Sequence, residues 1–220
     1  MIYILTSKKL ILFVFILILV ISITDSVLSM VPYKSYIYNY WGEVVESPHA
    51  YLPYKTISGE ELGIGNLKNP SDIFISEDKK IYILDSGNNR LISLNENWQI
   101  KSVIKNFDNN GEKDRFKNPK GVFVTKEGYI YICDTGNSRV LKFNKRGKLL
   151  DEMGKPESSL ENIFSNNFAY HPFSIVVSKV GRIYVLAENV LEGILEFDVD
   201  GNFRCFIGAP RVSINPVDYI

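Results

Sequence analysis

The chain has 220 residues, of which 45% are hydrophobic and 23% charged, and its 25 basic and 25 acidic side chains leave no formal net charge. This composition is that of a globular protein with enough apolar residues for a packed core. Because neither sign of charge forms a long run, a general affinity for nucleic acid or for anionic lipid is not indicated.

The amino-terminal residues have the layout of an export signal. Lys8 and Lys9 precede an uncharged run over Leu10–Thr24, and Asp25 closes it. A basic flank, an apolar run of this length and small residues after it are typical of a secretory signal, and the run is short for a bilayer span of about 20 residues. Residues 1–29 are therefore predicted to be a signal peptide or an N-terminal membrane anchor. Either assignment places the rest of the chain outside the cytoplasm, with membrane contact only through this segment.

Residues 30–59 are predicted to be a lead-in rich in aromatic side chains. Its last part, Tyr51–Ile57, is interpreted as a lone outer strand. Aromatic side chains of this kind stack on sugar rings or on a protein surface, or they pack the edge of a neighbouring fold. Both interpretations are open for the seven aromatic residues concerned, which are Tyr33, Tyr36, Tyr38, Tyr40, Trp41, Tyr51 and Tyr54.

A repeat with a period of about fifty residues follows. The Leu-Lys-Asn-Pro of residues 67–70 recurs as Phe-Lys-Asn-Pro at 116–119 and more weakly as Tyr-His-Pro at 170–172, so that the prolines are 49 and then 53 positions apart. An apolar run of the type Ile-Tyr-Ile-Leu comes at the same distance after each proline. The predicted units are residues 67–115, 116–169 and 170–208, within a repeat region that extends over residues 60–220.

Each unit is predicted to be a small antiparallel sheet of four strands. In the second unit the strands are Gly121–Thr125, Tyr129–Cys133, Arg139–Phe143 and Lys148–Met153, and glycine-containing turns separate them. The second strand is apolar at nearly every position, which suits a sheet that is covered on both faces. With no helical period of useful length after Asp25, the predicted fold class is all-β.

The second unit resembles the NHL repeat. The resemblance is carried by Asn-Pro-x-Gly-Val-Phe-Val over 118–124, Ile-Tyr-Ile-Cys-Asp over 130–134 and Gly-Asn-Ser-Arg-Val over 136–140. The Asp108–Arg115 loop is similar to the linker that precedes such repeats. The resemblance extends over roughly Glu60–Gly208 and implies a β-propeller whose blades have four antiparallel strands. It also implies an interaction platform, since propellers of this family commonly present loops to a partner.

The number of units is small for a closed propeller. NHL propellers usually close with about six blades, whereas this chain has three recognisable units. The expected ring is therefore incomplete: the chain is a truncated form of a longer protein, or a homo-oligomer completes the ring. A stack of repeats needs capped ends, and the sequence offers no polar cap.

An acidic and a basic residue recur five positions apart at the end of the apolar run. A tight turn separates the two, so each pair is expected to meet and brace its hairpin, with an asparagine that hydrogen-bonds the turn backbone. Recurrence in identical slots favours a structural role over a catalytic one. The third unit departs, with Ala-Glu-Asn-Val-Leu-Glu at 187–192. The predicted structural residues are Asp85, Asn88, Arg90, Asp134, Asn137 and Arg139.

Signals for catalysis and for bound metal are weak. The sequence has no Gly-x-Ser-x-Gly, and His49 and His171 are its only histidines. Cys133 and Cys205 lack the spacing of a metal site; they are interpreted as buried core residues, with a disulfide left open. The segment 198–202 faintly resembles a calcium loop but falls in the slot of a hairpin turn. No catalytic residue and no cofactor is predicted, and calcium is the weak alternative.

The function predicted from these observations is that of an exported, non-catalytic module that binds a protein or a carbohydrate and no nucleic acid. The alternative is a metal-dependent propeller hydrolase of the lactonase type, whose ligands would converge from different blades; the candidates are Asp72, Glu188 and Asn189. A third interpretation is a truncated product with no function of its own.

Overall fold

The computed structural model describes residues 34–48, 51, 55–157, 164, 168–190 and 193–208. It divides into two compact units, Met1–Thr56 and Ile57–Ile220, which are treated separately. The predictions for residues 1–29 and for His49 lie outside the described residues. No described helix is long and apolar enough to cross a membrane.

The described part of the first unit is a short β-hairpin. Strands β1 (Tyr36–Tyr38) and β2 (Val44–Glu46) pair in antiparallel register. The side chain of Asn39 accepts hydrogen bonds from the backbone N–H groups of Trp41 and Glu43, which closes the turn. The tyrosine, tryptophan and valine side chains of this hairpin are exposed. Of the predicted strand at 51–57, residue 51 and residues 55–57 have no regular secondary structure.

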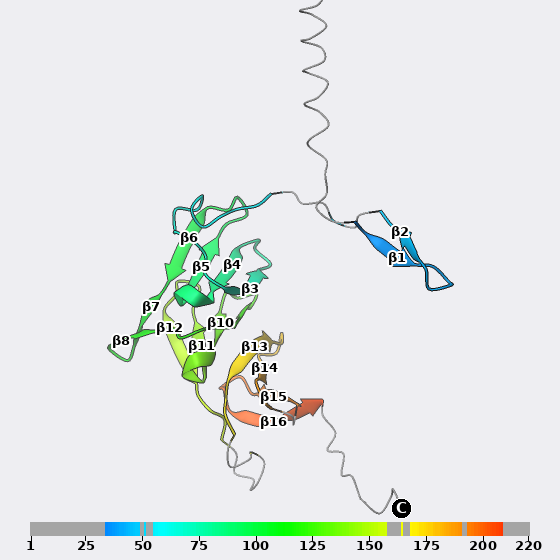
Figure 1. The fold of residues 1–220 in the computed structure, drawn as a ribbon. Helices are drawn as coiled ribbons and strands as arrows, with labels where there is room; N and C mark the ends of the chain where they lie inside the picture. Colours follow the sequence, from blue (N-terminus) through cyan, green and yellow to red (C-terminus); the bar gives the residue numbers. More distant parts are fainter. Residues whose placement is uncertain are drawn as a thin grey trace, which may run out of the picture. The chain divides into compact units, whose positions relative to one another are not determined.

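The second unit consists mainly of three four-stranded antiparallel sheets, here called blades 1, 2 and 3 (Figure 1). In each blade the four strands are neighbours in chain order. The predicted all-β fold with four-stranded antiparallel blades is therefore confirmed. Blade 1 is β3 (Pro70–Ile75), β4 (Ile81–Asp85), β5 (Arg90–Leu94) and β6 (Ile100–Ile104). Blade 2 is β9 (Gly121–Val124), β10 (Ile130–Asp134), β11 (Arg139–Phe143) and β12 (Leu149–Met153). Blade 3 is β13 (Pro172–Val177), β14 (Ile183–Ala187), β15 (Gly193–Phe197) and β16 (Phe203–Gly208).

Local sequence explains why these strands turn where they do. The first and second strands of blade 2 join at Thr125–Tyr129, where Gly128 has a φ of +89° that a side chain would oppose. The third and fourth strands join at Asn144–Lys148, and the Asn144 side chain accepts from the N–H groups of Arg146 and Lys148. β-branched and aromatic residues fill the strands between these turns, as a doubly covered sheet requires.

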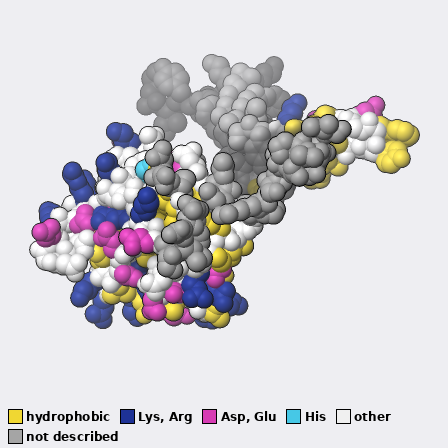
Figure 2. Space-filling view, turned by 90° about the horizontal axis from the view of Figure 1, so that it is seen from below, with side chains coloured by type: hydrophobic (Ala, Val, Ile, Leu, Met, Phe, Trp, Pro, Cys, Tyr) yellow, Lys and Arg dark blue, Asp and Glu magenta, His cyan; other side chains and the backbone are white. Residues whose placement is uncertain are grey.

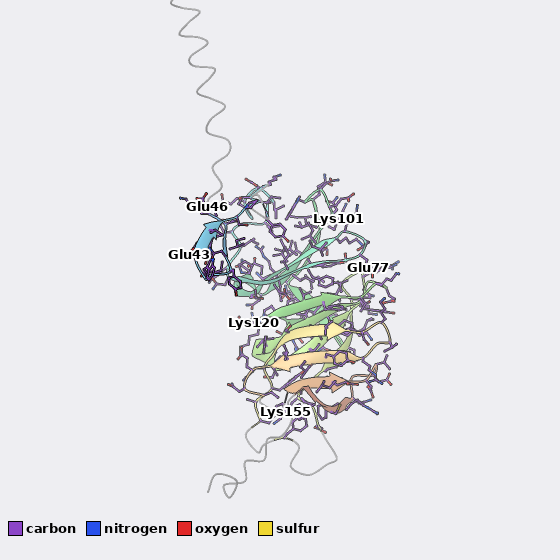
Figure 3. The ribbon with its side chains drawn as sticks, turned by 90° about the vertical axis from the view of Figure 1, so that its right-hand side faces the viewer. Glu43, Glu46, Glu77, Lys101, Lys120 and Lys155 are labelled. Atoms are coloured by element: carbon purple, nitrogen blue, oxygen red, sulfur yellow. The ribbon has the colours of Figure 1, made fainter. Side chains whose placement is uncertain are left out.

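Packing between blades forms the core. Each blade has two faces. The outgoing face is the one on the side of the following blade in chain order, and the incoming face is the one on the side of the preceding blade. The outgoing face of blade 1 and the incoming face of blade 2 bury one cluster that includes Tyr82, Leu84, Ile132 and Phe143. The outgoing face of blade 2 and the incoming face of blade 3 bury a second cluster. Figure 3 shows the sheets stacked in this way.

The segment that was predicted to be a linker loop before blade 2 is a second hairpin. Strands β7 (Asn106–Asn109) and β8 (Glu112–Arg115) pair across Asn110 and Gly111, which have φ values of +56° and +91°. Positive φ at both turn positions matches the twist of a two-residue hairpin. Phe107 of this hairpin packs into the core between blades 1 and 2, so the hairpin is part of the blade architecture.

The blades have two ends with different structures. At one end, here called the turn rim, lie the six turns of residues 76–80, 95–99, 125–129, 144–148, 178–182 and 198–202. At the other, here called the brace rim, lie the 3-10 turns η1 (Ser86–Asn88) and η2 (Thr135–Asn137). Figure 3 shows Glu77 and Lys120 on opposite sides of the stack, at these two ends.

The two cysteines differ in environment. Cys133 is fully buried in β10, and burial raises the pKa of its thiol. Cys205 lies in β16 and is exposed, so the prediction that it is a buried core residue is wrong. It stands on the outgoing face of blade 3, opposite Glu196 of β15, where the described blades place no neighbour. Both cysteines are free.

Candidate functional site

The repeated polar residues of blade 2 form a buried brace around one carboxylate. Asp134 ends β10 and is fully buried. Its Oδ1 accepts from the backbone N–H of Lys117 at 2.7 Å. Its Oδ2 accepts from Asn137 Nδ2 at 2.9 Å and from Arg139 Nε at 2.9 Å. One carboxylate therefore ties the segment before β9, the η2 turn and the start of β11 together.

Blade 1 repeats the same brace. Asp85 is fully buried and accepts from the backbone N–H of Lys68 at 2.7 Å. It also accepts from Asn88 Nδ2 and from Arg90 Nε, both at 2.8 Å. The structure thus brings together the predicted residues of each repeat within their own blade. Because each brace is buried and saturated with donors, its geometry is suited to holding a hairpin rather than to meeting a ligand.

The asparagines act differently from the prediction. They were expected to hydrogen-bond the turn backbone. Besides the carboxylate, Asn88 instead donates to the carbonyl of Asn66 at 3.0 Å, and Asn137 donates to the carbonyl of Arg115 at 3.2 Å. Both carbonyls belong to the segment that leads into the blade. Each asparagine therefore fastens this lead-in segment to its own blade.

The arginine of blade 2 extends its brace to the β7–β8 hairpin and to the outer strand. Arg139 Nη1 donates to Asp114 Oδ2 at 2.8 Å and to Glu152 Oε2 at 3.1 Å. In blade 1, Arg90 Nη1 donates instead to the carbonyl of Ile64 at 2.8 Å. The Arg139 guanidinium, through its hydrogen bond, lowers the pKa of the Asp114 carboxyl to about 2.

Asp114 should make folding stability depend on pH in the acid range. Its folded pKa lies below the usual value of 3.8, so its contribution is complete above pH 4 and is lost as the pH falls towards 2. The shift corresponds to about 2 kcal/mol as an upper value, because the side chain is partly exposed. Urea unfolding of wild type and Asp114→Asn between pH 2 and pH 6 measures it. The two curves should converge at low pH, and a constant gap would contradict this assignment.

The described residues of blade 3 form no equivalent of the brace. Ala187 replaces the aspartate, and the backbone N–H of Glu188 donates to the carbonyl of His171 at 2.9 Å. His171 Nδ1 lies 3.4 Å from the carbonyl oxygen of Thr135 and 3.5 Å from Ser138 Oγ. This histidine therefore sits at the joint with blade 2, away from any nucleophile-base pair among the described residues.

Hydrogen bonds between blades end mostly on backbone atoms. The hydroxyl of Ser86 donates to the carbonyl of Pro119, and the hydroxyl of Thr135 donates to the carbonyl of Pro172 at 2.6 Å. The two bonds occupy the same place in successive joints. Asp72 Oδ2 also accepts from the backbone N–H of Val122 at 2.8 Å.

The residues considered as metal ligands do not converge. Both oxygens of Asp72 accept backbone N–H groups, from Ile73 at 2.8 Å and from blade 2. Glu188 and Asn189 are exposed on the turn of blade 3. Among the described residues no group of three or more His, Cys, Asp or Glu side chains is placed to hold a metal ion. In the segment 198–202, Asp198 accepts from two backbone N–H groups of its own hairpin turn.

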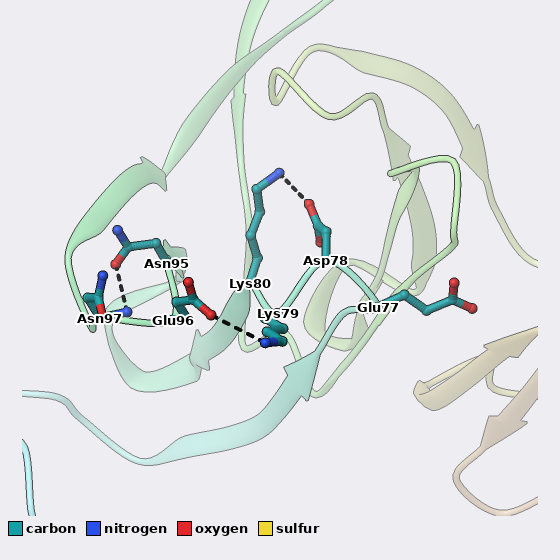
Figure 4. Close-up of a pocket in the computed structure, with 7 residues that line it drawn as sticks. All are labelled: Glu77, Asp78, Lys79, Lys80, Asn95, Glu96 and Asn97. Atoms are coloured by element: carbon teal, nitrogen blue, oxygen red, sulfur yellow. Dashed lines mark hydrogen bonds and ion pairs between the residues drawn. The ribbon is translucent and has the colours of Figure 1, made fainter.

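Shallow depressions lie along the turn rim, and one of about 670 Å³ lies between the β7–β8 hairpin and the outer strand β12. One of about 410 Å³ lies on blade 1, between the turn 77–80 and residues 95–97 (Figure 4). Figure 4 shows ion pairs across and beside it, between Lys79 and Glu96 at 3.7 Å and between Lys80 and Asp78 at 2.7 Å. Further depressions of about 250 Å³ and 330 Å³ lie between the turns of blades 1 and 2 and on blade 2, and one of about 560 Å³ lies on blade 3.

The turn rim carries charges of both signs and two half-exposed aromatic rings. Lys and Arg side chains are intermixed with Asp and Glu over the described surface in Figure 2, without a large patch of one sign. Trp98 and Tyr129 are 37% and 39% exposed, and Lys142 Nζ lies 5.3 Å from the Tyr129 ring. The sequence analysis did not select these turn residues. The sequence feature that could have identified them is that charged or amide residues recur in every turn of the repeat.

Comparison with family models finds the NHL repeat at residues 116–143, which are most of blade 2. The chain thus contains an NHL repeat in a β-propeller-type fold, as the sequence analysis predicted from the same residues. No curated protein sequence matches the chain.

Three solved structures are similar to this chain at low identity and with TM-scores below 0.5. A catalytically inactive virginiamycin B lyase from Staphylococcus aureus, solved with quinupristin, is 17% identical with a TM-score of 0.47; the match covers 82% of this chain and 50% of that one. Hydrazine synthase from Kuenenia stuttgartiensis is 15% identical with a TM-score of 0.48, over 71% of this chain and 38% of that one. A gluconolactonase from Xanthomonas campestris is 15% identical with a TM-score of 0.46, over 80% and 55%. The chain spans about half the length of these proteins or less.

Proposed function

We propose that this chain, an NHL-repeat protein of the propeller type, is an exported, non-catalytic binding module whose turn rim contacts a protein partner. The observation that carries the proposal is the division of polar residues between the two rims. At the brace rim the recurring charged side chains are buried and satisfied within each blade. At the turn rim the charged side chains are exposed around open depressions.

A protein surface suits the turn rim better than a carbohydrate does. Exposed charges of alternating sign, such as Glu77, Lys79 and Glu96, provide complementarity to a mixed surface and discriminate between partners. A glycan would use the aromatic faces of Trp98 and Tyr129 as stacking platforms, and these two rings are only half exposed. A carbohydrate ligand is the other outcome of the test below.

The test compares partner binding by a variant with reversed charges on the turn rim and by a variant with reversed charges elsewhere on the surface. The rim variant carries Glu77→Lys, Glu96→Lys and Glu127→Lys, which are exposed turn positions. The matched control carries the same reversal at Glu112, Glu157 and Glu188, which are exposed positions away from the turn rim. Both are used with wild type to capture cross-linked partners from the fraction outside the cytoplasm.

A protein captured by wild type and control, lost in the rim variant and weakened by salt, supports the proposal. A carbohydrate bound on a glycan array, lost in Trp98→Ala with Tyr129→Ala but kept by the rim variant, replaces the protein partner with a glycan. Partners that all three charge forms capture equally contradict the turn rim as the contact surface. Calcium-dependent hydrolysis of a simple aliphatic lactone, abolished by a chelator, would support the hydrolase alternative instead.

The proposed location follows from the apolar run at residues 10–24. Protease added outside an intact cytoplasmic membrane should digest the full chain in the expressing cell. Deletion of residues 2–25 should protect the chain by leaving it inside. Protection of both forms would contradict export.

A further inference from the structure

In the part of the chain that the structure describes, two blade faces have no blade packed on them, whereas the equivalent faces elsewhere in the chain do. Blade 2 covers the outgoing face of blade 1, and blade 3 covers the outgoing face of blade 2. Among the described residues, no blade covers the incoming face of blade 1 or the outgoing face of blade 3. On both faces, apolar side chains are exposed at register positions where the equivalent residues of other blades are buried.

On the incoming face of blade 1, the inner strand exposes apolar side chains. Ile73 and Ile75 of β3 are 58% and 65% exposed. Val122 and Val124 hold the same register positions in blade 2 and are 4% and 5% exposed, because blade 1 packs on them. The isoleucines therefore occupy places that a preceding blade normally covers.

On the outgoing face of blade 3 the same comparison holds. Leu186 of β14 is 39% exposed, whereas Leu84 and Cys133 at this position in blades 1 and 2 are fully buried. Ile207 of β16 is 38% exposed, whereas its equivalent Met153 is 6% exposed. Leu186 and Ile207 match the buried residues of the other outgoing faces in type and register, and no described blade packs on them.

The segment before blade 1 covers part of the incoming face of that blade, where Leu62, Ile64 and Leu67 pack. Ile81, Ile83, Ile92 and Leu94 on the middle strands are buried, and the part that stays open is the inner strand with Ile73 and Ile75. The carbonyls of Ile64 and Asn66 bond to the arginine and asparagine of the blade 1 brace. In blade 2 the carbonyl of Arg115, at the end of the β7–β8 hairpin, accepts the bonds equivalent to those of Asn66, and blade 1 also packs there. This segment is thus the counterpart of the hairpin, and it leaves the inner strand of blade 1 uncovered among the described residues.

We propose that a second copy of this chain covers both faces, so that blade 3 of each copy packs its outgoing face on the incoming face of blade 1 of the other. The contact continues an interface that the chain already builds twice. The two described joints share hydrogen bonds from the hydroxyls of Ser86 and Thr135 to the carbonyls of Pro119 and Pro172. Glu188 holds the equivalent position in blade 3, so the joint between copies rests on apolar contact instead of this bond. A two-fold pair uses both open faces of each copy at once, whereas a contact that does not close grows into a filament.

One position distinguishes the joint between copies from the joints within a chain. Gly147 and Gly201 approach the preceding blade so closely that a Cβ would lie 2.9 Å from Ile104 and 2.8 Å from Met153. Trp98 holds this turn position in blade 1. In the pair its indole lies against Ile207 of the second copy and displaces that side chain. Trp98 is therefore a built-in reporter of association.

The experiment measures the mass of the full chain by light scattering in mild detergent, with the detergent contribution subtracted. Two 25.1 kDa chains per particle are expected. Ile73→Asp with Ile75→Asp, or Leu186→Asp with Ile207→Asp, should weaken association about 100-fold, because each aspartate would be buried without a partner. The control Leu150→Asp lies on the outer strand of the middle blade and should remain a pair.

The most discriminating experiment mixes the two double variants and measures whether pairs form. A mixed pair keeps one joint with both faces intact, so pairs should reappear in the mixture but in neither variant alone. In a Trp41→Phe background, the Trp98 emission should shift to shorter wavelength as pairs form. A single chain at all concentrations, a ladder of larger species, or a pair that is indifferent to both double variants overturns the proposal. Because binding at the turn rim is measured separately by charge reversal, failure of the pair leaves the proposed function standing.

Discussion

Asp134→Asn is expected to lower the stability of the fold by about 3 kcal/mol, the scale for breaking a buried ion pair by removing one partner. The amide that replaces Oδ2 would point donors at the donors of Asn137 and Arg139. Arg139 keeps its contacts with Asp114 and Glu152, which limits the loss. The midpoint of thermal unfolding should fall by about 10 °C.

The same change in blade 1 should cost more. Among the described residues, Asp85 is the one carboxylate that pairs with Arg90, so Asp85→Asn leaves that guanidinium with carbonyl partners only. Asp200→Asn, at an exposed turn position, is the control and should stay within about 0.5 kcal/mol of wild type. A variant of Asp134 that melts like wild type and yet loses its partner would make this residue a binding residue instead of a brace.

Gly121→Ala is expected to destabilise the joint between blades 2 and 3 by about 2 kcal/mol, within the range for overpacking a filled site. A Cβ at this position would lie 2.5 Å from the carbonyl oxygen of Phe173 and 3.1 Å from the Cα of Ser174. These are backbone atoms of β13, so relief requires blade 3 to move away. The buried contacts of the second core cluster would loosen with it.

Hydrogen exchange measured by mass spectrometry locates this effect. Exchange should rise in residues 172–187 of Gly121→Ala while blade 1 stays protected. Gly154→Ala is the matched control, because nothing lies within 4 Å of a Cβ built there. Equal exchange in both blades would show that the three sheets open as one unit and not joint by joint.

Much of the blade architecture could be predicted from the repeat itself. The apolar second strands, the turn glycines and the spacing of Asp134 and Arg139 indicate four-stranded sheets, and the structure shows these sheets with boundaries close to those expected. Such local signals are readable because strand alternation, turn chemistry and a short ion pair all act within a few residues.

Contacts between segments that are distant in the chain could not be predicted from the sequence. Nothing local in Asn66 or Ile64 marks their carbonyls as partners of Asn88 and Arg90, 22 and 26 positions away. The β7–β8 hairpin escaped for a different reason, since its strands are polar and only Asn110 and Gly111 signal the turn. Cys205 sits in an apolar stretch, and its exposure depends on which blade stands next to it.

The brace of blade 2 is encoded by one continuous stretch of the chain. The side chains and carbonyls that satisfy Asp134 and Arg139 lie between residues 114 and 152, so the whole hydrogen-bonded set travels in one stretch of chain. Bonds from Ser86 and Thr135 across joints end on carbonyls that any residue would provide. A gene segment that encodes one blade with its lead-in thus carries a complete brace when it is duplicated, whereas its joints still require close approaches such as that of Gly121 to Phe173. In blade 3, Ala187 stands at the position of this aspartate, and the sequence from there to Phe197 is one residue longer than the sequence from Asp134 to Phe143.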